Sequence, residues 1–367
     1  MVDLKDSIDM TVAFRVDASE MIGSGHLIRC LTLAGRLRTL GLNSTFICAE
    51  ATSDLIDLVA QRGFAVKQIT NCTGKGIFDT QSQKFDNYNW KLDADDTAAF
   101  LKYLKFNWLV VDHYSLDVQW EKMIKPYVDK IMVIDDLANR EHEADILLDQ
   151  NLYPDMMERY NQKLNSDCQT FLGLDYALLQ PEYAKLRKNK FIPKNKVDRI
   201  MMYFGNATTN SLATRFVDSF VSLKRSELFL DIVLSPNDKQ REYIQEVSKL
   251  HRNIVLHEPQ VSLSQLMSKA DVAIGAGGAT NWERICLGVP SIVVTVAENQ
   301  RKCAEYINKL GLINLIGDAE TISDAKLNTE LRNLINNPNL ASWSQKCFDC
   351  FDGLGAEKIA NIIIEAS

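Results

Sequence analysis

The chain has 367 residues, of which 46% are apolar and 24% are charged, and its net charge is −7. The composition is that of an ordinary globular protein, and the length predicts two domains. The acidic balance argues against a nucleic-acid-binding surface but still permits a local basic pocket for a phosphorylated small molecule. The polar start MVDLKDSIDM lacks the apolar segment of a signal peptide, and no apolar run approaches the ~20 residues that span a bilayer. We therefore expect a cytoplasmic protein that binds neither nucleic acid nor membranes.

Short apolar runs alternate with amphipathic stretches along the whole chain and fall into two sets of similar length. The expected strands of the two sets cover residues 11–16, 45–49, 65–69, 108–111, 131–134 and 146–148, then 200–204, 230–234, 254–256, 272–276, 292–296 and 313–316. Residues 26–41 and 280–289 have helical periodicity, and Gly41 suits the end of the first helix. Strands that alternate with helices predict parallel sheets covered on both faces. The predicted fold is α/β, with two doubly wound Rossmann-like domains.

Residues 181–198 separate the two sets of strands and contain two prolines among many lysines and arginines. A run of this kind is typical of a solvated linker. We therefore expect an N-terminal domain over 1–180 and a C-terminal domain over 199–367, with the last helix packing back on the first domain. Ligands of such sheets bind at the carboxyl ends of the strands, so the expected site is the cleft between the domains. Residues 72–91 lack a clear period and predict a long surface loop that covers this cleft.

The first candidate motif is RVDASEMIGSGHLIRC, which links the first strand to the first helix. Its glycines allow a tight turn, and His26 follows them at the helix start. The N–H groups of a helix start favour an anion and disfavour a proton on the imidazole. A neutral imidazole accepts protons, so His26 is a candidate general base, although a capping histidine in a structural turn would look the same. The candidate substrate-binding residues of this motif are Arg15, Asp17, Gly23, Gly25 and Arg29.

The second motif is VVDHYSLDVQWE, in which Asp112, His113 and Tyr114 directly follow an apolar strand. They therefore lie at its carboxyl end, where a ligand is expected. Tyr114 can donate a hydrogen bond to a ligand oxygen, and His113 can donate or accept one. The alternative is an ordinary turn in which Asp112 caps the next helix.

Two further groups of polar residues give weak metal signals. Asp135 and Asp136 are adjacent at another strand end, so their side chains diverge and a structural role is favoured over a paired acid and base. Cys347 and Cys350 form a single C-x2-C pair, and zinc sites of this kind need a second pair of ligands. We therefore expect neither a metal nor another cofactor.

The stretch 271–300 combines a Gly-Gly turn at a strand end, a helix that Thr280 or Asn281 can cap, and a later Glu-Asn-Gln after the next strand. Glycines at a helix start can cradle a phosphate, and a carboxylate can accept hydrogen bonds from two ribose hydroxyls. A Gly-rich packing turn is the alternative interpretation. The candidate nucleotide-binding residues are Gly277, Gly278, Asn281, Glu283, Glu298, Asn299 and Gln300, with Gly205 and Asn206 from the first turn of the second domain.

These stretches, together with VIDDLANREHEADILLDQN and FLGLDYALLQPEY, resemble in order the UDP-sugar hydrolases of the pseudaminic acid pathway. The resemblance covers roughly residues 11–350 and implies a two-domain fold similar to the GT-B glycosyltransferases, the class of MurG. In that family the catalytic base matches His26, an active-site tyrosine matches Tyr114, and the nucleotide half-site matches the Gly-Gly, Glu and Asn-Gln positions above. Many members have Gly-Gly-Ala-Asp where this chain has Gly205-Asn206-Ala207-Thr208.

The resemblance implies a reaction. UDP-2,4-diacetamido-2,4,6-trideoxy-β-L-altropyranose is hydrolysed to UDP and 2,4-diacetamido-2,4,6-trideoxy-L-altrose, without a metal and with inversion at C1, by water that the histidine activates. A small-molecule UDP-sugar is the expected partner, and we expect a monomer. An inverting GT-B UDP-glycosyltransferase needs the same half-site and the same kind of base, so it remains an alternative. A non-catalytic sugar-nucleotide-binding module is the other.

Overall fold

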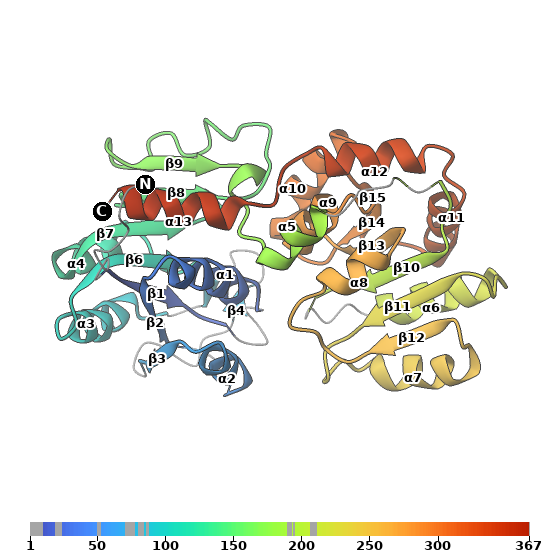
Figure 1. The fold of residues 1–367 in the computed structure, drawn as a ribbon, viewed down its shortest axis with the longest axis horizontal. Coiled ribbons are helices and arrows are strands. Elements are labelled where there is room, and N and C mark those ends of the chain that lie inside the picture. The colour runs from blue at the N-terminus through green and yellow to red at the C-terminus, as the bar shows by residue number, and fades with distance from the viewer. Residues whose placement is uncertain are drawn as a thin grey trace. The chain divides into compact units, whose positions relative to one another are not determined.

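The computed structural model describes residues 10–18, 24–49, 53–69, 78–79, 84–85, 88–188, 193, 195–205 and 211–366. The chain divides into two compact units (Figure 1). Unit 1 comprises Met1–Leu178 and Leu354–Ser367, and unit 2 comprises Leu179–Gly353. None of the helices in the described part of the chain is long and apolar enough to cross a membrane.

Unit 1 contains a seven-stranded parallel sheet in the order β3-β2-β1-β6-β7-β8-β9. Its strands are β1 (Thr11–Val16), β2 (Asn43–Cys48), β3 (Ala65–Gln68), β6 (Phe106–Asp112), β7 (Val128–Ile134), β8 (Ile146–Asp149) and β9 (Gln169–Leu172). Its helices are α1 (Gly25–Thr39), α2 (Ser53–Gln61), α3 (Trp90–Leu101), α4 (Val118–Ile124) and α13 (Gly355–Glu365), with short 3-10 turns η1 (Lys125–Tyr127) and η2 (Leu174–Tyr176).

Alternation along β1 divides its side chains between two cores. Val12 and Phe14 pack with α1 and α13, whereas Ala13 packs with α3 and α4 on the opposite face. This period of two is the geometry of a strand that is buried on both sides. The carboxyl ends of β1, β6 and β7 therefore open at one edge of a sheet whose two faces are closed by helices.

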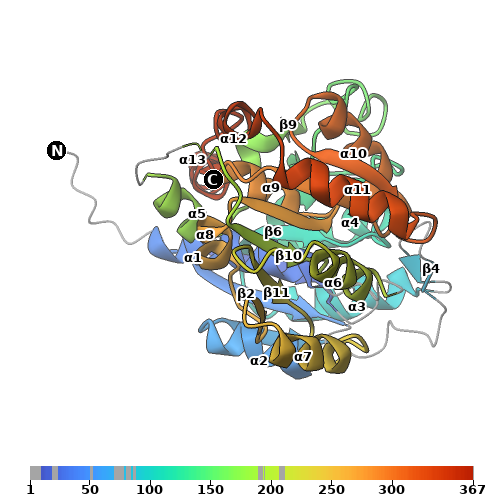
Figure 2. The same ribbon diagram turned by 90° about the vertical axis from the view of Figure 1, so that its right-hand side faces the viewer.

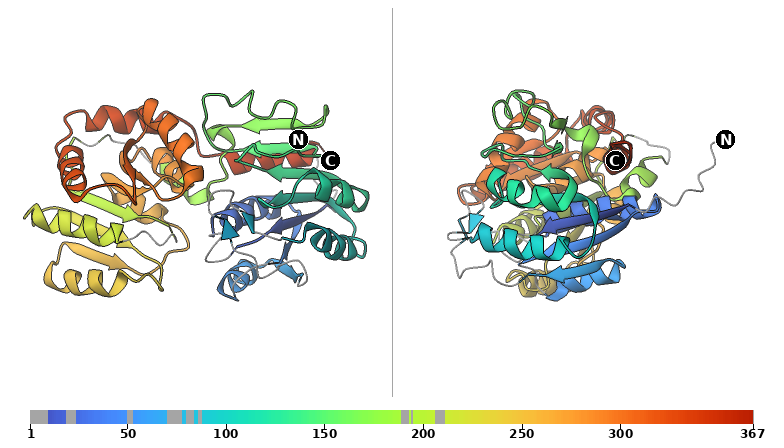
Figure 3. Two further views of the ribbon diagram at one scale, coloured as in Figure 1. Left: turned by 180° about the vertical axis from the view of Figure 1, so that it is seen from behind. Right: turned by 90° about the vertical axis from the view of Figure 1, so that its left-hand side faces the viewer.

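Unit 2 contains a six-stranded parallel sheet in the order β12-β11-β10-β13-β14-β15. Its strands are β10 (Arg199–Tyr203), β11 (Phe229–Val233), β12 (Ile254–His257), β13 (Val272–Ala276), β14 (Ser291–Thr295) and β15 (Asn314–Asp318). Its helices are α5 (Pro181–Arg187), α6 (Leu212–Ser222), α7 (Arg241–Leu250), α8 (Ser264–Lys269), α9 (Thr280–Cys286), α10 (Glu298–Lys309), α11 (Asp324–Ile335) and α12 (Leu340–Phe348). Helices α6 and α11 lie side by side and contribute to one core (Figure 2). Figure 3 shows both sheets from behind, with β3 and β12 as edge strands.

Three local expectations need correction. The first part of 181–198 is not a solvated linker, because residues 181–187 form α5 and Tyr183 is fully buried where α5 packs on α8 and α9. Part of 72–91 is ordered secondary structure, since β4 (Phe78–Asp79) pairs antiparallel with β5 (Lys84–Phe85) and α3 begins at Trp90. Strand β9 has no counterpart among the expected strands, because its four residues QTFL are half exposed and carry no clear alternation.

Candidate active site

Two neighbouring strands and one helix of unit 1 bring four polar side chains together. His26 and Arg29 lie in the first turns of α1, Asp112 ends β6, and Asp136 follows β7. Because β1, β6 and β7 are neighbours in the sheet, their carboxyl ends are adjacent. This is the edge at which parallel α/β sheets bind ligands.

The centre of this group is a hydrogen bond between His26 and Asp112. The Nδ1 atom of His26 lies 2.6 Å from Oδ1 of Asp112, whose side chain is completely buried. Nη2 of Arg29 lies farther from Nδ1, at 3.1 Å, and donates to Asp112. Because a carboxylate only accepts hydrogen bonds, the short contact with Asp112 puts the proton on Nδ1, which donates it. Among the described residues Nε2 of His26 has no hydrogen-bond partner, and 10% of the side chain is exposed. The imidazole is therefore held in the tautomer whose free nitrogen accepts a proton.

Arg29 holds the same carboxylate from the other side. Its Nε donates to Oδ2 of Asp112 at 2.5 Å and its Nη2 donates to Oδ1 at 2.6 Å, while its Nη1 donates to Oδ2 of Asp136 at 3.1 Å. Burial by itself would raise the pKa of Asp112, but the charge of Arg29 and the hydrogen bonds that Asp112 accepts from Arg29 and His26 outweigh it and hold this pKa well below its usual range. Asp112 is therefore ionised at neutral pH. From the sequence, Asp112 was expected at the strand end where a ligand binds, with capping of the next helix as the alternative, and Asp136 was expected to have a structural role or to support the site from behind.

Tyr114 packs against the imidazole instead of presenting a free hydroxyl. Its ring meets that of His26 edge-on, with the centroids 4.6 Å apart and the planes at 86°. Its hydroxyl donates to Oδ1 of Asp136 at 2.7 Å, where sequence analysis expected a donor for a ligand oxygen. Burial first, and the charge of Asp136 second, raise the pKa of Tyr114 well above its ordinary value, so the phenol stays protonated.

Arg15 and Asp17 point into a closed network instead of towards a ligand. Arg15 is fully buried and donates to Asp17 at 2.7 Å and to Asp93 of α3 at 2.5 Å. It also donates to the hydroxyl of Tyr88 at 2.6 Å. Burial opposes ionisation of Asp17, yet Arg15 outweighs it and keeps the pKa of Asp17 well below its usual range. The two residues that sequence analysis placed at the substrate therefore tie β1 to α3.

His113 belongs to this network as well. Its Nε2 lies 3.0 Å from Oδ2 of Asp17, and its Nδ1 accepts from the backbone N–H of Ser115 at 3.1 Å. Burial lowers the pKa of His113, which keeps the ring neutral, although Asp17 opposes the shift. Both ring nitrogens are thus engaged within unit 1. Sequence analysis offered His113 as a substrate-binding residue, but in this structure it supports the turn that carries Tyr114.

Only two of the four candidate residues in the turns after β1 and β10, Gly25 and Gly205, lie in the described part of the chain. Gly25 is the first residue of α1, and a Cβ atom there would meet no atom of the described residues within 4 Å. Gly205 follows β10 with a φ of +81°, a conformation that suits glycine. The expected contacts of Gly23 and Asn206 lie outside the described residues.

In unit 2 the Gly-Gly turn packs against Gln300 of α10. A Cβ atom on Gly277 would lie 3.2 Å from both Cβ and Oε1 of Gln300, and one on Gly278 would lie 3.6 Å from its Nε2. The Oε1 atom of Gln300 accepts from the backbone N–H of Val296 at 3.1 Å. These three residues therefore lie side by side, and the glutamine amide fixes the turn between β14 and α10.

Helix α9 is not capped by Thr280 or Asn281. Its N-cap is Ala279, and Asn281 lies inside the helix, fully buried, where its Oδ1 accepts from Arg284. Arg284 is also buried and donates to the carbonyl of Ala276 at 2.8 Å. Gly275 makes room for this arrangement, because a Cβ atom there would lie 2.6 Å from the backbone oxygen of Tyr203 and would overlap Arg284. Sequence analysis missed both Arg284 and Gly275.

Several polar atoms near this turn are buried without a hydrogen-bond partner among the described residues. They are Nδ2 of Asn281, Oε2 of Glu283 and Oδ1 of Asn299. Burial raises the pKa of Glu283 to about 7, with Tyr183 and Arg284 opposing the shift. Buried polar atoms are normally satisfied, so a polar ligand suits these positions. Glu298 differs, since it is exposed and pairs with Arg301 at 3.1 Å.

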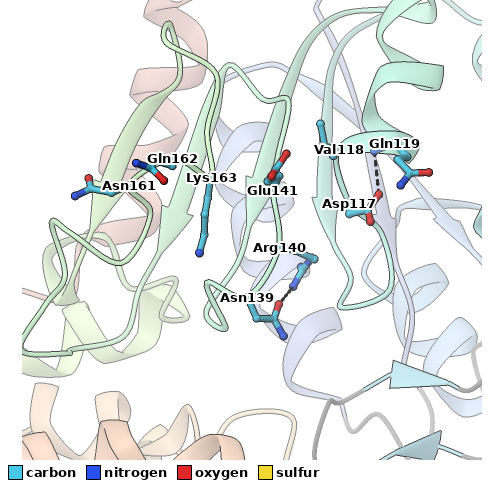
Figure 4. A pocket seen from close by; sticks show the side chains of 9 residues that line it. All are labelled: Asp117, Val118, Gln119, Asn139, Arg140, Glu141, Asn161, Gln162 and Lys163. Atoms are coloured by element: carbon cyan, nitrogen blue, oxygen red, sulfur yellow. Dashed lines mark hydrogen bonds between the residues drawn. The ribbon is translucent and has the colours of Figure 1, made fainter.

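A separate cavity of about 540 Å³ opens on unit 1 (Figure 4). Acidic, basic and amide side chains line it without a dominant charge; they are Asp117, Gln119, Asn139, Arg140, Glu141, Asn161, Gln162 and Lys163, together with Val118. Asp117 caps α4 through the N–H of Gln119, and Asn139 accepts from Arg140. None of the site residues proposed above lines this cavity. In the described part of the chain no three histidine, cysteine or acidic side chains are grouped to hold a metal ion.

Comparison with known proteins supports the family resemblance. A family described as "Protein of unknown function (DUF354)" matches residues 162–342. An uncharacterized protein of Methanocaldococcus jannaschii is 23% identical over 313 residues, which are 83% of this chain, and the chain spans only 60% of that relative. A UDP-2,4-diacetamido-2,4,6-trideoxy-beta-L-altropyranose hydrolase of Campylobacter jejuni is 25% identical over 304 residues, 82% of this chain and 97% of the relative. The resemblance to this hydrolase that the motifs indicated is thereby confirmed.

Among solved structures, MurG of Acinetobacter baumannii is similar to 97% of this chain and 99% of its own, with a TM-score of 0.67 and 15% identity. At this identity the likeness concerns the fold. The predicted architecture is confirmed: the chain has a two-domain α/β fold of the GT-B class, with parallel sheets of seven and six strands.

Proposed function

We propose that the protein hydrolyses UDP-2,4-diacetamido-2,4,6-trideoxy-β-L-altropyranose to UDP and 2,4-diacetamido-2,4,6-trideoxy-L-altrose. The observation that carries the proposal is the buried Asp112–His26 hydrogen bond of 2.6 Å, which leaves Nε2 of the imidazole free to accept a proton. The similarity to the Campylobacter jejuni hydrolase supports the substrate. The base belongs to unit 1, and the proposal assigns the UDP moiety to unit 2.

In the proposed step, Nε2 of His26 takes a proton from water while the water oxygen forms a bond to C1 of the sugar. The bond between C1 and the phosphate oxygen breaks, and its electron pair leaves with UDP. Attack from the face opposite to UDP inverts the configuration at C1. The ionised Asp112 stabilises the imidazolium that forms, as the carboxylate of a catalytic triad does.

The nucleotide is assigned to the turn around Gly277 and Gly278. Backbone N–H groups there and the unpartnered Nδ2 of Asn281 can donate to phosphate oxygens as negative charge grows on the leaving group. Glu283 can accept from ribose hydroxyls, and Asn299 offers an amide to the same ligand. The proposal gives no role to a metal ion or to another cofactor.

The first test is to replace the base. His26→Asn should keep UDP affinity near that of the wild type and lower kcat by about 10²–10⁴-fold, the usual contribution of a positioned base. Turnover is followed by ¹H NMR of the anomeric proton, which also shows the anomer formed first. His251→Asn is the matched control, because this histidine ends α7 in unit 2 and is expected to leave turnover unchanged. Wild-type turnover by a folded His26→Asn protein would exclude this base.

An inverting UDP-glycosyltransferase is the second candidate, and the fold shared with MurG favours it. The same free nitrogen can deprotonate an acceptor hydroxyl in place of water. A time course with the UDP-sugar alone separates the two: a hydrolase releases free sugar, whereas a transferase needs an added acceptor. A non-catalytic binding module would bind UDP in calorimetry and release no sugar in either experiment. Epimeric UDP-diacetamido-trideoxyhexoses in the same assay identify the preferred sugar.

A further inference from the structure

We propose that Asp136 is a positioning residue that raises the affinity of His26 for a proton, acting through Arg29 and Tyr114. Its catalytic consequence rests on the proposed function, in which His26 is the base. The inference itself concerns the protonation of His26, which can be measured without any substrate.

The contacts of Arg29 carry the first step. One guanidinium serves two carboxylates, because it donates twice to Asp112 and once to Asp136. With a neutral imidazole the group of His26, Arg29, Asp112 and Asp136 carries one excess negative charge. A proton on His26 brings the sum to zero. Since three of these side chains are nine-tenths or more buried and that of Asp136 is 13% exposed, solvent screens the imbalance only weakly.

Tyr114 provides the second connection between Asp136 and the imidazole. Its hydroxyl donates to Oδ1 of Asp136 at 2.7 Å, and its ring lies edge-on to His26. The hydrogen bond fixes the rotation of the Tyr114 ring and therefore the position of the aromatic surface that the imidazole contacts. Asp136 thus acts on the base in two ways, through charge and through the position of an aromatic ring.

The backbone of Asp136 is itself anchored by the segment after β8. The hydroxyl of Tyr153 donates to its carbonyl at 3.2 Å, and Nη2 of Arg159 donates to the same oxygen at 2.9 Å. The guanidinium of Arg159 lies over the ring of Tyr153, 3.5 Å from its centroid, and pairs with Asp149 at 3.3 Å. Two donors on one carbonyl oxygen restrict the direction in which the carboxylate points.

Other charged and titratable groups surround this arrangement and must be held constant in a test. On the side of Asp136 these groups are Asp135, which pairs with Arg140, and then Tyr160 and Asp149. Burial raises the pKa of Asp149 to about 7. On the side of His26 they are Asp112 from β6, Tyr114, Arg29 and the start of α1. Arg15, Asp17, Asp93 and the neutral His113 form a separate network with one excess negative charge. A single substitution at Asp136 leaves all of them in place, so the difference from the wild type reports Asp136.

The decisive experiment is an NMR titration of the His26 ring proton on Cε1 in the wild-type protein and in Asp136→Asn. The signal is assigned from its loss in His26→Asn, since the chain has only five histidines. Removal of the negative charge should lower the pH at which His26 is half protonated by about 0.5–1 unit, because a nearby carboxylate favours the charged imidazole. Asp136→Glu keeps the negative charge, so His26 in this variant should titrate as in the wild type.

Tyr114→Phe separates the two ways of action. It removes the hydroxyl but keeps the charge of Asp136, so the midpoint of His26 should move less than in Asp136→Asn. If Asp136→Asn does not fold, Asp136→Ser is used in its place, because serine also removes the negative charge and has a smaller side chain. An unchanged midpoint in a folded neutral variant, or a midpoint that rises, would overturn the inference.

Kinetics then connect the inference to the proposed reaction. In Asp136→Asn the acid limb of the kcat/KM profile should move to lower pH with the NMR midpoint, and kcat on the plateau should fall about 2–3-fold because the base is weaker. KM should stay near the wild-type value. If His26 titrates as expected but no sugar is released by the wild type, the hydrolase proposal fails and the role of Asp136 stands.

Discussion

Replacing Asp112 by asparagine changes one atom type at the centre of the candidate site, and the structure shows why that change is costly. Both carboxylate oxygens already accept from Arg29, and Oδ1 also accepts from His26. An amide has only one oxygen. If its NH₂ group takes the Oδ2 position it faces Nε of Arg29, and if it takes the Oδ1 position it faces Nη2 of Arg29 and Nδ1 of His26. Either orientation sets a donor against a donor.

The second orientation has a chemical consequence beyond the lost hydrogen bond. An NH₂ group that donates to Nδ1 of His26 forces the ring proton onto Nε2, which removes the lone pair that would accept a proton from water. The corresponding aspartate-to-asparagine change in serine proteases costs about 10⁴-fold in kcat. For Asp112→Asn we expect a loss of about 10³–10⁴-fold, with KM little changed.

The effect on stability is expected to be smaller than that on catalysis. Breaking a buried ion pair typically costs about 3–5 kcal/mol. Arg29 keeps its contact with Asp136 and one amide oxygen at position 112, so we expect about 2–3 kcal/mol in the free energy of unfolding. Urea unfolding followed by circular dichroism measures this cost, and release of UDP and sugar measures kcat.

Asp117→Asn is the matched control, because the partly exposed Asp117 caps α4 and asparagine caps helices equally well. It should change neither kcat nor the urea midpoint. A folded Asp112→Asn protein with wild-type kcat would refute the reasoning about the tautomer. A large loss of kcat with an unchanged free energy of unfolding would show that the ion pair between Asp112 and Arg29 does not stabilise the fold.

Two further predictions concern unit 2. Gly275→Ala should lower the free energy of unfolding by about 1–3 kcal/mol through overpacking, because its Cβ would lie 2.6 Å from the oxygen of Tyr203. The control is Gly35→Ala on α1 of unit 1, where the Cβ meets open space and should raise the free energy of unfolding by ~1 kcal/mol. Equal urea midpoints for the two variants would contradict this prediction. The pKa of Glu283 is raised to about 7, so the wild type should lose stability relative to Glu283→Gln as pH rises from about 4.3 to 7. Parallel stability curves over that window, from urea midpoints at several pH values, would show that the burial of Glu283 has no such effect.

The sheets could be predicted from the sequence because their strands are buried on both faces, so the signal is a run of apolar residues between helical segments. The expected strand over 11–16 coincides with β1, and the expected helix end near Gly41 matches a residue with a φ of +91°. The half-exposed β9 lacked this signal. Helix α5 was hidden because the basic residues of 181–198 suggested a solvent-exposed run, whereas only Tyr183 and Ala184 of this helix are buried.

The candidate site could be predicted only in part, for a different reason. His26 and Tyr114 stood out because each lies beside a strand end in a recognisable motif. The partner of His26 is 86 residues away along the chain, and Asp93 is 78 residues from Arg15, so no local pattern pairs them. Arg15 and Asp17 were expected at a ligand because they are charged and close to a strand end. Arg15 is instead buried against Asp93, which only the tertiary structure brings into contact.

Helix α13 makes the core of unit 1 depend on two distant parts of the chain. It is the last helix of the chain, yet its Ile359, Ala360 and Ile363 complete the same core as α1 and β1. Unit 2 is therefore inserted within unit 1 in the order of synthesis. A ribosome makes all of unit 2 before the helix that closes the face behind His26, so the domain that begins first is finished last. A nascent chain or a fragment that stops at residue 178 lacks α13 and leaves that apolar face of unit 1 open.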